Sequence, residues 1–229
     1  MRVRAVGVDA CRRGWVAVVL DDGRLAATRH ATTLAEIVDA YPEAEAVGVD
    51  MPLGLADRGW READRLAAIR LGAYRSRVFL VPPRAAWDAG DHAGAVRACR
   101  RLTEPPAGFS RQAWGLKDKL GEANELYARP RQRLFEVHPE ISFAELNGGP
   151  PVAAGKKTWN GQMARRALLA DAGIRLREDL ADAGTVPPDD ILDAAAAAWS
   201  AGRIARGQAS SLPGPPQTGT GGVAMAIWF

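Results

Sequence analysis

The chain has 229 residues, of which 47% are hydrophobic and 25% are charged, a balance that is typical of globular proteins and argues against global disorder. Its formal net charge of +3 permits a nucleic-acid partner but is too small to argue for one. The two cysteines, Cys11 and Cys99, lack CxxC spacing, which argues against a disulfide framework or a zinc knuckle. We expect one domain over residues 1–229.

The sequence contains no stretch with the apolar length of a membrane span. Arg2, Arg4 and Asp9 surround or interrupt the first apolar run, unlike the pattern of a secretion signal. With so few cysteines, a reducing compartment is the default. We therefore expect a cytoplasmic protein that does not enter a membrane.

The first fifty residues predict a three-stranded meander, a helix and a fourth strand. Asp21-Asp22-Gly23 is a hairpin signal, and Thr33 with Glu36 has the spacing of a capping box. The run AVGVD occurs twice, at Ala5–Asp9 and at Ala46–Asp50, and each copy is short, apolar and rich in valine, as in buried strands. The expected strands cover residues 3–8, 15–20, 24–30 and 46–50, and the expected helix covers residues 34–41.

The remainder of the chain predicts mainly helices, with a helical insertion over about residues 57–130. The tail over about residues 207–229 has no charged residue and is expected to form a loop followed by an edge strand from Val223 to Phe229. The expected helices cover residues 61–71, 92–102, 110–127, 140–146, 156–172 and 189–204, and further strands are expected at 78–81 and 131–138.

Asp9 and Asp50 each end one of the two similar strands. If the fourth strand lies beside the first in parallel, the two carboxylates emerge at the same edge of the sheet. Like charges 4 Å apart repel by roughly 4 kcal/mol at an effective dielectric constant of about 20, and a divalent cation would reverse that penalty. The alternative is that Asp9 only caps or braces the turn that follows it.

A third acid is available in the last predicted helix. Asp190 and Asp193 in DDILDAAAAAWSA are three residues apart and share a helix face. Asp189 and Asp190 have an adequate role as N-caps, but Asp193 lies inside the helix before a run of alanines that could press against a sheet. Oxygen ligands without cysteine favour Mg²⁺ or Mn²⁺ over Zn²⁺.

Several motifs, in the same order along nearly the whole chain, resemble the DUF429 family of predicted ribonuclease H-like nucleases. These motifs are GVDACRRGW at 7–15, VGVDMPLGL at 47–55, SRVFLVPP at 76–83, FEVHPEISF at 135–143, KKTWNGQ at 156–162 and DDILDAAAAAWSA at 189–201. The resemblance implies an α/β fold of the ribonuclease H-like type, a mixed five-stranded sheet flanked by helices. It also implies that Asp9, Asp50 and Asp193 form a metal site.

The implied activity is hydrolysis of a phosphodiester by a two-metal mechanism. Asp9 would bridge both ions, and Asp50 and Asp193 would hold one each. Glu136 and His138 sit at the end of the predicted fifth strand, where one of them could orient the attacking water or complete the site. For His138 the alternative is a packing histidine that makes hydrogen bonds.

Basic residues near these motifs could meet the phosphates of a DNA or RNA partner. They are Arg12, Arg13, Lys156 and Lys157, and Trp159 beside the lysines is a possible ligand contact. A solvated basic surface is the alternative for each pair. Because one fold hosts many functions, the alternative to a nuclease is a relative that binds a nucleotide or nucleic acid without cleaving it.

Overall fold

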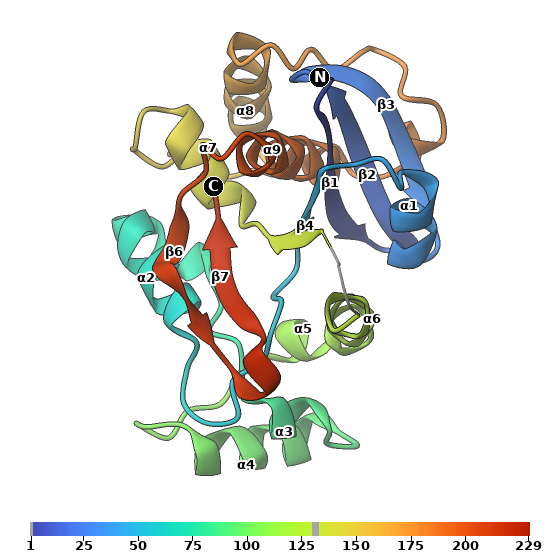
Figure 1. Cartoon of the computed structure of the whole chain (residues 1–229). Coiled ribbons are helices and arrows are strands. Elements are labelled where there is room, and N and C mark those ends of the chain that lie inside the picture. The colour runs from blue at the N-terminus through green and yellow to red at the C-terminus, as the bar shows by residue number, and fades with distance from the viewer. Residues whose placement is uncertain (1, 130–132) are drawn as a thin grey trace. The chain divides into compact units, whose positions relative to one another are not determined.

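The computed structural model describes residues 2–129 and 133–229, which divide into two compact units (Figure 1). The first unit contains residues 2–51, 133–210 and 228–229, and the second contains residues 52–129 and 211–227. The second unit overlaps in sequence with the insertion that was expected over about residues 57–130. In the described parts of the chain, no helix combines the length and apolar character needed to cross a membrane.

The first unit is built on a mixed five-stranded sheet in the order β3-β2-β1-β4-β5. β1 and β3 are antiparallel to β2, whereas β4 is parallel to both β1 and β5. This order confirms the predicted α/β class and the ribonuclease H-like arrangement. The strands are β1 (Arg4–Cys11), β2 (Gly14–Asp21), β3 (Arg24–Ala31), β4 (Ala46–Asp50) and β5 (Leu134–Glu136).

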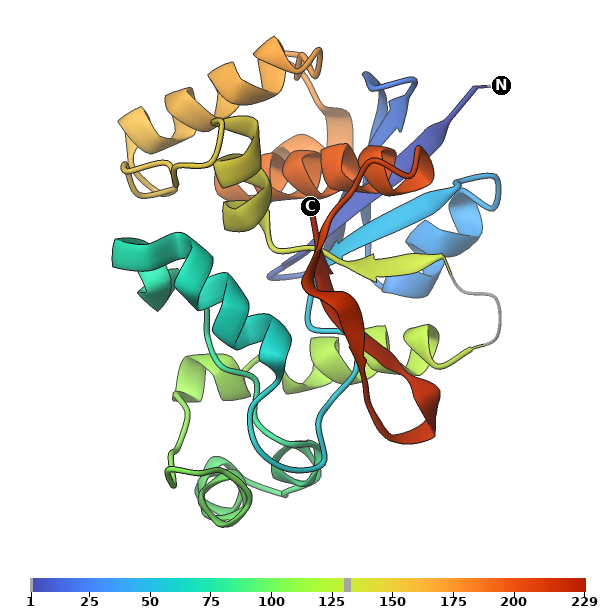
Figure 2. The same cartoon turned by 60° about the vertical axis from the view of Figure 1, so that its left-hand side comes forward.

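Helix α9 (Pro188–Ala205) lies directly on β1, β2 and β4 (Figure 2). Two strand glycines make the approach this close: a Cβ on Gly7 would lie 1.9 Å from the backbone nitrogen of Ala198, and a Cβ on Gly48 would lie 2.6 Å from the carbonyl oxygen of Ala197. The helix contributes a matching run of fully buried alanines, Ala194–Ala198. Small residues on both partners therefore fix α9, and with it Asp193, against the centre of the sheet.

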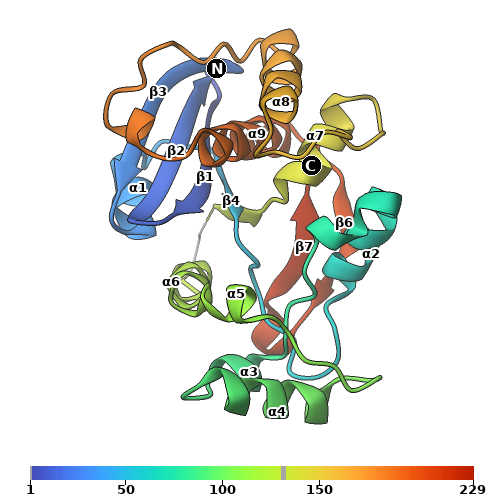
Figure 3. The ribbon, with the colours of Figure 1, turned by 180° about the vertical axis from the view of Figure 1, so that it is seen from behind.

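Other helices complete the layers of the first unit. α7 (Pro139–Leu146) and α8 (Trp159–Asp171) pack against α9 (Figure 3), where Phe143 and Leu169 join its buried cluster. On the other face of the sheet, α1 (Leu34–Ala40) packs against β2 and β3 and buries Leu34 and Ile37. As expected, Thr33 caps α1 by accepting a hydrogen bond from the Glu36 backbone N–H.

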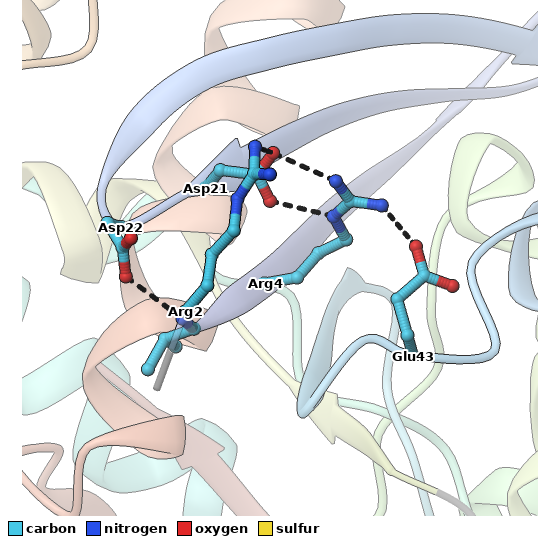
Figure 4. A network of polar contacts seen from close by, with 6 residues as sticks. Arg2, Arg4, Asp21, Asp22 and Glu43 are labelled. Carbon is cyan, nitrogen blue, oxygen red and sulfur yellow. Dashed lines mark hydrogen bonds and ion pairs between the residues drawn. The ribbon is translucent and has the colours of Figure 1, made fainter.

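An ionic network fixes the register of β1 against its neighbours (Figure 4). Arg4 of β1 lies opposite Asp21 of β2 and donates to both carboxylate oxygens, at 2.7 and 2.9 Å. The same guanidinium pairs with Glu43, which precedes β4. A one-residue slip would separate these partners and move the apolar side chains to the wrong face, so Arg4 helps to align the strands that carry Asp9 and Asp50.

The second unit is mainly helical. Its helices are α2 (Glu62–Leu71), a short 3-10 helix (Gly72–Arg77), α3 (Arg84–Trp87), α4 (His92–Leu102), α5 (Arg111–Trp114) and α6 (Lys117–Tyr127). The helix expected over residues 110–127 is thus divided into α5 and α6, because the first helix ends at Gly115. The strand expected over residues 78–81 is wrong: the Val81 N–H donates to the buried Asp64 carboxylate at 2.9 Å instead of to a strand.

The tail also differs from expectation. Residues 208–222 were expected to be a loop, but β6 (Ser211–Thr218) pairs with β7 (Ala224–Trp228) in a separate two-stranded sheet. β6 contains three prolines, which lack N–H donors and are tolerated in a strand that has a partner on only one side. The composition therefore concealed the strand. The expected strand over residues 131–138 is observed as β5, and its first two residues lie outside those that the structure describes.

Candidate metal centre

Three carboxylates from three elements converge at one edge of the main sheet. Asp9 near the end of β1 lies directly opposite Asp50 at the end of β4 in the parallel pairing. Asp193 reaches them from the second turn of α9. One oxygen from each carboxylate lies within 4.8 Å of the others. The parallel register pairs the two AVGVD runs residue by residue and so brings Asp9 and Asp50 level, as expected, and the close approach of α9 adds Asp193.

The three carboxylates are costly to ionise together. Burial, followed by the charges of Asp50 and Asp193, raises the pKa of Asp9 well above its ordinary value. Burial and the charge of Asp193 raise the pKa of Asp50 to about 8. Burial raises the pKa of Asp193 to about 6, against an opposing effect of the Lys156 ammonium. Apolar surroundings and mutual repulsion thus both favour the neutral acids unless cations are present.

Lys156 supplies one such cation. Its Nζ lies 2.5 Å from Oδ2 of Asp193. Burial alone would lower the pKa of this ammonium, but the charges of Asp193, Asp50 and Asp9 outweigh that effect and raise it. Lys156 was expected to meet a phosphate of the substrate, with a solvated basic surface as the alternative. In the structure it contacts the acidic cluster, and its role in substrate binding stays a prediction.

The other carboxylate oxygen of Asp193 is shielded from solvent and lacks a hydrogen-bond donor among the described residues. Oδ1 is buried and accepts no hydrogen bond from any of the described residues. A buried carboxylate oxygen without a donor is costly, and coordination to a cation would satisfy it. The donor set consists of three carboxylates, which suits Mg²⁺ or Mn²⁺, so the residues present fit a divalent cation.

Two charged residues near the cluster escaped the sequence analysis. Arg165 of α8 is fully buried and donates to Glu140 of α7 at 2.5 Å. Glu140 lies close enough to the acidic cluster for its charge to raise the pKa values of Asp50 and Asp193. In the sequence both residues resemble ordinary polar positions on helices, and only the pairing in three dimensions distinguishes them.

Asp190 also contributes to the electrostatics of the site. It was expected to act as an N-cap, but α9 begins one residue earlier than expected, at Pro188, so Asp190 lies in the first turn of the helix. Burial and the charge of Asp189 raise the pKa of Asp190 to about 6. Its own charge in turn raises the pKa of Asp9, which places Asp190 beside the three carboxylates as an additional acid.

Glu136 and His138 have different positions from the three aspartates. Glu136 pairs with Val49 rather than Asp50, and because side chains alternate along a strand its carboxylate points to the face opposite Asp50. Its charge nevertheless raises the pKa of Asp50. His138 is half-buried and occupies the N-cap position of α7. Direct catalytic roles for Glu136 and His138 stay predictions.

The remaining candidate residues are exposed. Arg12 and Arg13 form the turn between β1 and β2, directly after the strand that carries Asp9. Lys157 follows Lys156 but is exposed to solvent, and Trp159 at the start of α8 is 73% exposed. An exposed tryptophan of this kind is available to stack on a ligand.

Comparison with known proteins identifies one family. Its profile, described as "Protein of unknown function (DUF429)", matches residues 7–218. The matched range includes Asp9, Asp50 and Asp193 together with Lys156. No curated protein and no solved structure matches the chain. Since the match covers most of the sequence, the chain belongs to the DUF429 family.

Proposed function

We propose that this chain is a nuclease that hydrolyses phosphodiester bonds and depends on Mg²⁺ or Mn²⁺. The observation that carries the proposal is the convergence of Asp9, Asp50 and Asp193, whose oxygens lie within 4.8 Å of one another. Two of these side chains are less than 7% exposed. Buried acids at this density are expensive to maintain without a cation.

The three aspartates would hold the cation through carboxylate oxygens that lie within 4.8 Å of one another. Bound divalent ions in such sites lower the pKa of an attacking water and stabilise the charge on the leaving oxygen. Arg12 and Arg13 carry positive charge close to the end of β1, where they would bind flanking phosphates. Lys157 and the exposed Trp159 would bind a further phosphate and stack on a nucleobase.

The direct test is cleavage of a panel of DNA and RNA substrates that includes single strands, duplexes, hybrids and branched molecules. We expect purified protein to cleave at least one of them with Mg²⁺ or Mn²⁺ and not in EDTA. Asp9→Asn should abolish the cleavage, because it removes the central ligand. The exposed carboxylate of Asp39 on α1 provides the control, and Asp39→Asn should cleave like the wild type.

Thermal unfolding of both variants separates loss of chemistry from loss of fold. Asp9→Asn should be at least as stable as the wild type without metal, since the substitution relieves a buried charge. Cleavage that survives in Asp9→Asn, or a wild type that cleaves no substrate with either metal, contradicts the proposal. Calorimetric binding of ATP or a nucleic acid without cleavage would favour the alternative of a binding protein.

A further inference from the structure

Lys156 places a positive charge against the acidic cluster through its contact with Asp193. We propose that its ammonium substitutes for one of two divalent cations, so that the site binds a single metal ion with Lys156 as the second positive charge. This inference rests on the proposed function, because it concerns the same site. It replaces the two-ion arrangement with one ion and one lysine.

The contacts of Asp193 support this division of the site. Its Oδ2 oxygen already has a cationic partner, the Lys156 Nζ at 2.5 Å. Its Oδ1 oxygen is buried, and no described residue donates a hydrogen bond to it. The carboxylate thus has one oxygen committed to a lysine and one without a donor. Asp193 can therefore bridge Lys156 to a single metal ion that it shares with Asp9 and Asp50.

The loop that carries Lys156 is held rigidly. Thr158 donates its hydroxyl proton to the Gly155 carbonyl and accepts from the Gly161 N–H. Gly155 and Gly161 are so close that a Cβ on Gly161 would lie 1.9 Å from the Gly155 carbonyl oxygen. The backbone on both sides of Lys156 is therefore fixed before any ligand binds.

Arg165 also holds the loop that carries Lys156. Its guanidinium is fully buried and donates to the Ala154 carbonyl at 3.0 Å, to the Gly161 carbonyl at 3.1 Å and to Glu140 at 2.5 Å. These contacts hold the backbone of the loop that carries Lys156, which favours a fixed position for its ammonium. A charge that is already in place can stabilise a bound ligand without rearrangement of the protein.

The Lys156 ammonium also offsets part of the charge of the cluster. It balances one of the three negative charges that Asp9, Asp50 and Asp193 carry when ionised, so less positive charge is needed from metal ions. A fixed ammonium at this position would also stabilise negative charge on a phosphate bound next to the metal.

Manganese binding tests the inference without reference to activity. Isothermal titration of the wild type with Mn²⁺ should give one ion per chain, and the electron paramagnetic resonance spectrum should be that of isolated rather than coupled Mn²⁺. Lys156→Gln frees Asp193 and removes a competing charge, so its Mn²⁺ affinity should rise by at least about tenfold. Arg24 of β3 is exposed, and Arg24→Gln should bind Mn²⁺ like the wild type.

The outcomes separate the two proposals. Two coupled Mn²⁺ ions in the wild type would overturn the inference while leaving the nuclease proposal intact. An unchanged or weakened affinity in folded Lys156→Gln would overturn it as well. A wild type that binds no Mn²⁺ would instead refute the metal site on which the proposed function depends. Because the stoichiometry is measured on the wild type, the inference stays testable even if Lys156→Gln does not fold.

Discussion

Asp50→Asn should stabilise the metal-free protein, although it removes a residue of the candidate site. Burial and the charge of Asp193 raise the pKa of Asp50 from 3.8 to about 8. At pH 7 the carboxyl group is therefore mostly protonated in the folded protein and ionised in the unfolded chain. At ~1.4 kcal/mol per pKa unit, about three units separate pH 7 from the ordinary value, and the folded state is destabilised by about 4 kcal/mol.

The sign of the pH dependence follows from the raised pKa. The destabilisation is complete above about pH 8, where the folded protein must ionise Asp50, and it disappears as the pH falls through the ordinary value of 3.8. Asparagine is neutral at every pH, but its amide donors need partners, which reduces the gain. We expect Asp50→Asn to gain about 2 kcal/mol at pH 7.5 and to be less stable than the wild type at pH 4.5, where the penalty on the wild type has fallen to about 1 kcal/mol and the cost of the amide remains.

Urea unfolding in EDTA, followed by tryptophan fluorescence at pH 4.5 and pH 7.5, measures this difference. Thermal unfolding at pH 7.5 should show a midpoint about 4–8 °C higher than that of the wild type. Asp39→Asn, at an exposed position, should leave both midpoints unchanged. If Asp50→Asn is no more stable than the wild type at pH 7.5, or gains equally at both pH values, the electrostatic reasoning about the cluster is refuted.

Three further changes test the packing and the charges around the site. Gly7→Ala places a Cβ 1.9 Å from a backbone nitrogen of α9 and should lower the free energy of unfolding, measured by urea titration, by at least about 3 kcal/mol. The control, Gly121→Ala in an open helical position, should be neutral or stabilising. Arg165→Met removes the buried partner of Glu140 and should lower the free energy of unfolding by about 3–5 kcal/mol. The double variant with Glu140→Gln should recover part of this stability, and a double variant without recovery would argue against a stabilising Arg165–Glu140 pair. Mn²⁺ at about 100 times its dissociation constant should stabilise the wild type by about 2.7 kcal/mol in thermal unfolding and should not stabilise Asp9→Asn.

The position of the acidic cluster was predictable because it depends on local and periodic features. Two similar apolar runs that each lead to an aspartate become level neighbours once they pair in parallel and in register, as Asp9 and Asp50 do. Asp193 is distinguished by the alanine run that follows it, since only a helix with small residues can approach a sheet of glycine and valine this closely. The pairing of Asp9 with Asp50 and the close approach of Asp193 each depend on only a few residues. The strand order, with β1 next to β4, brings them together at one edge of the sheet.

The surroundings of the cluster were not predictable in the same way. Arg165 and Glu140 are 25 residues apart in sequence, and nothing in the pattern of either helix shows that they meet in the interior. Lys156 belongs to a pair of lysines that resembles a solvated basic surface. Its contact with Asp193 depends on a turn closed by Thr158 and Gly155. Long-range pairing of charges is decided by tertiary packing, which single-sequence periodicity does not encode.

The same packing explains why the three acids are costly to ionise together. Gly7 and Gly48 have no side chains to separate α9 from the sheet, and the helix therefore brings Asp193 into a space that Asp9 and Asp50 already occupy. A larger residue at either glycine would keep Asp193 farther away and make the three acids less costly to ionise. Because the close approach is built into the two central strands and the helix, the repulsion among the acids is a property of the fold, and the charge of the Lys156 ammonium offsets part of it.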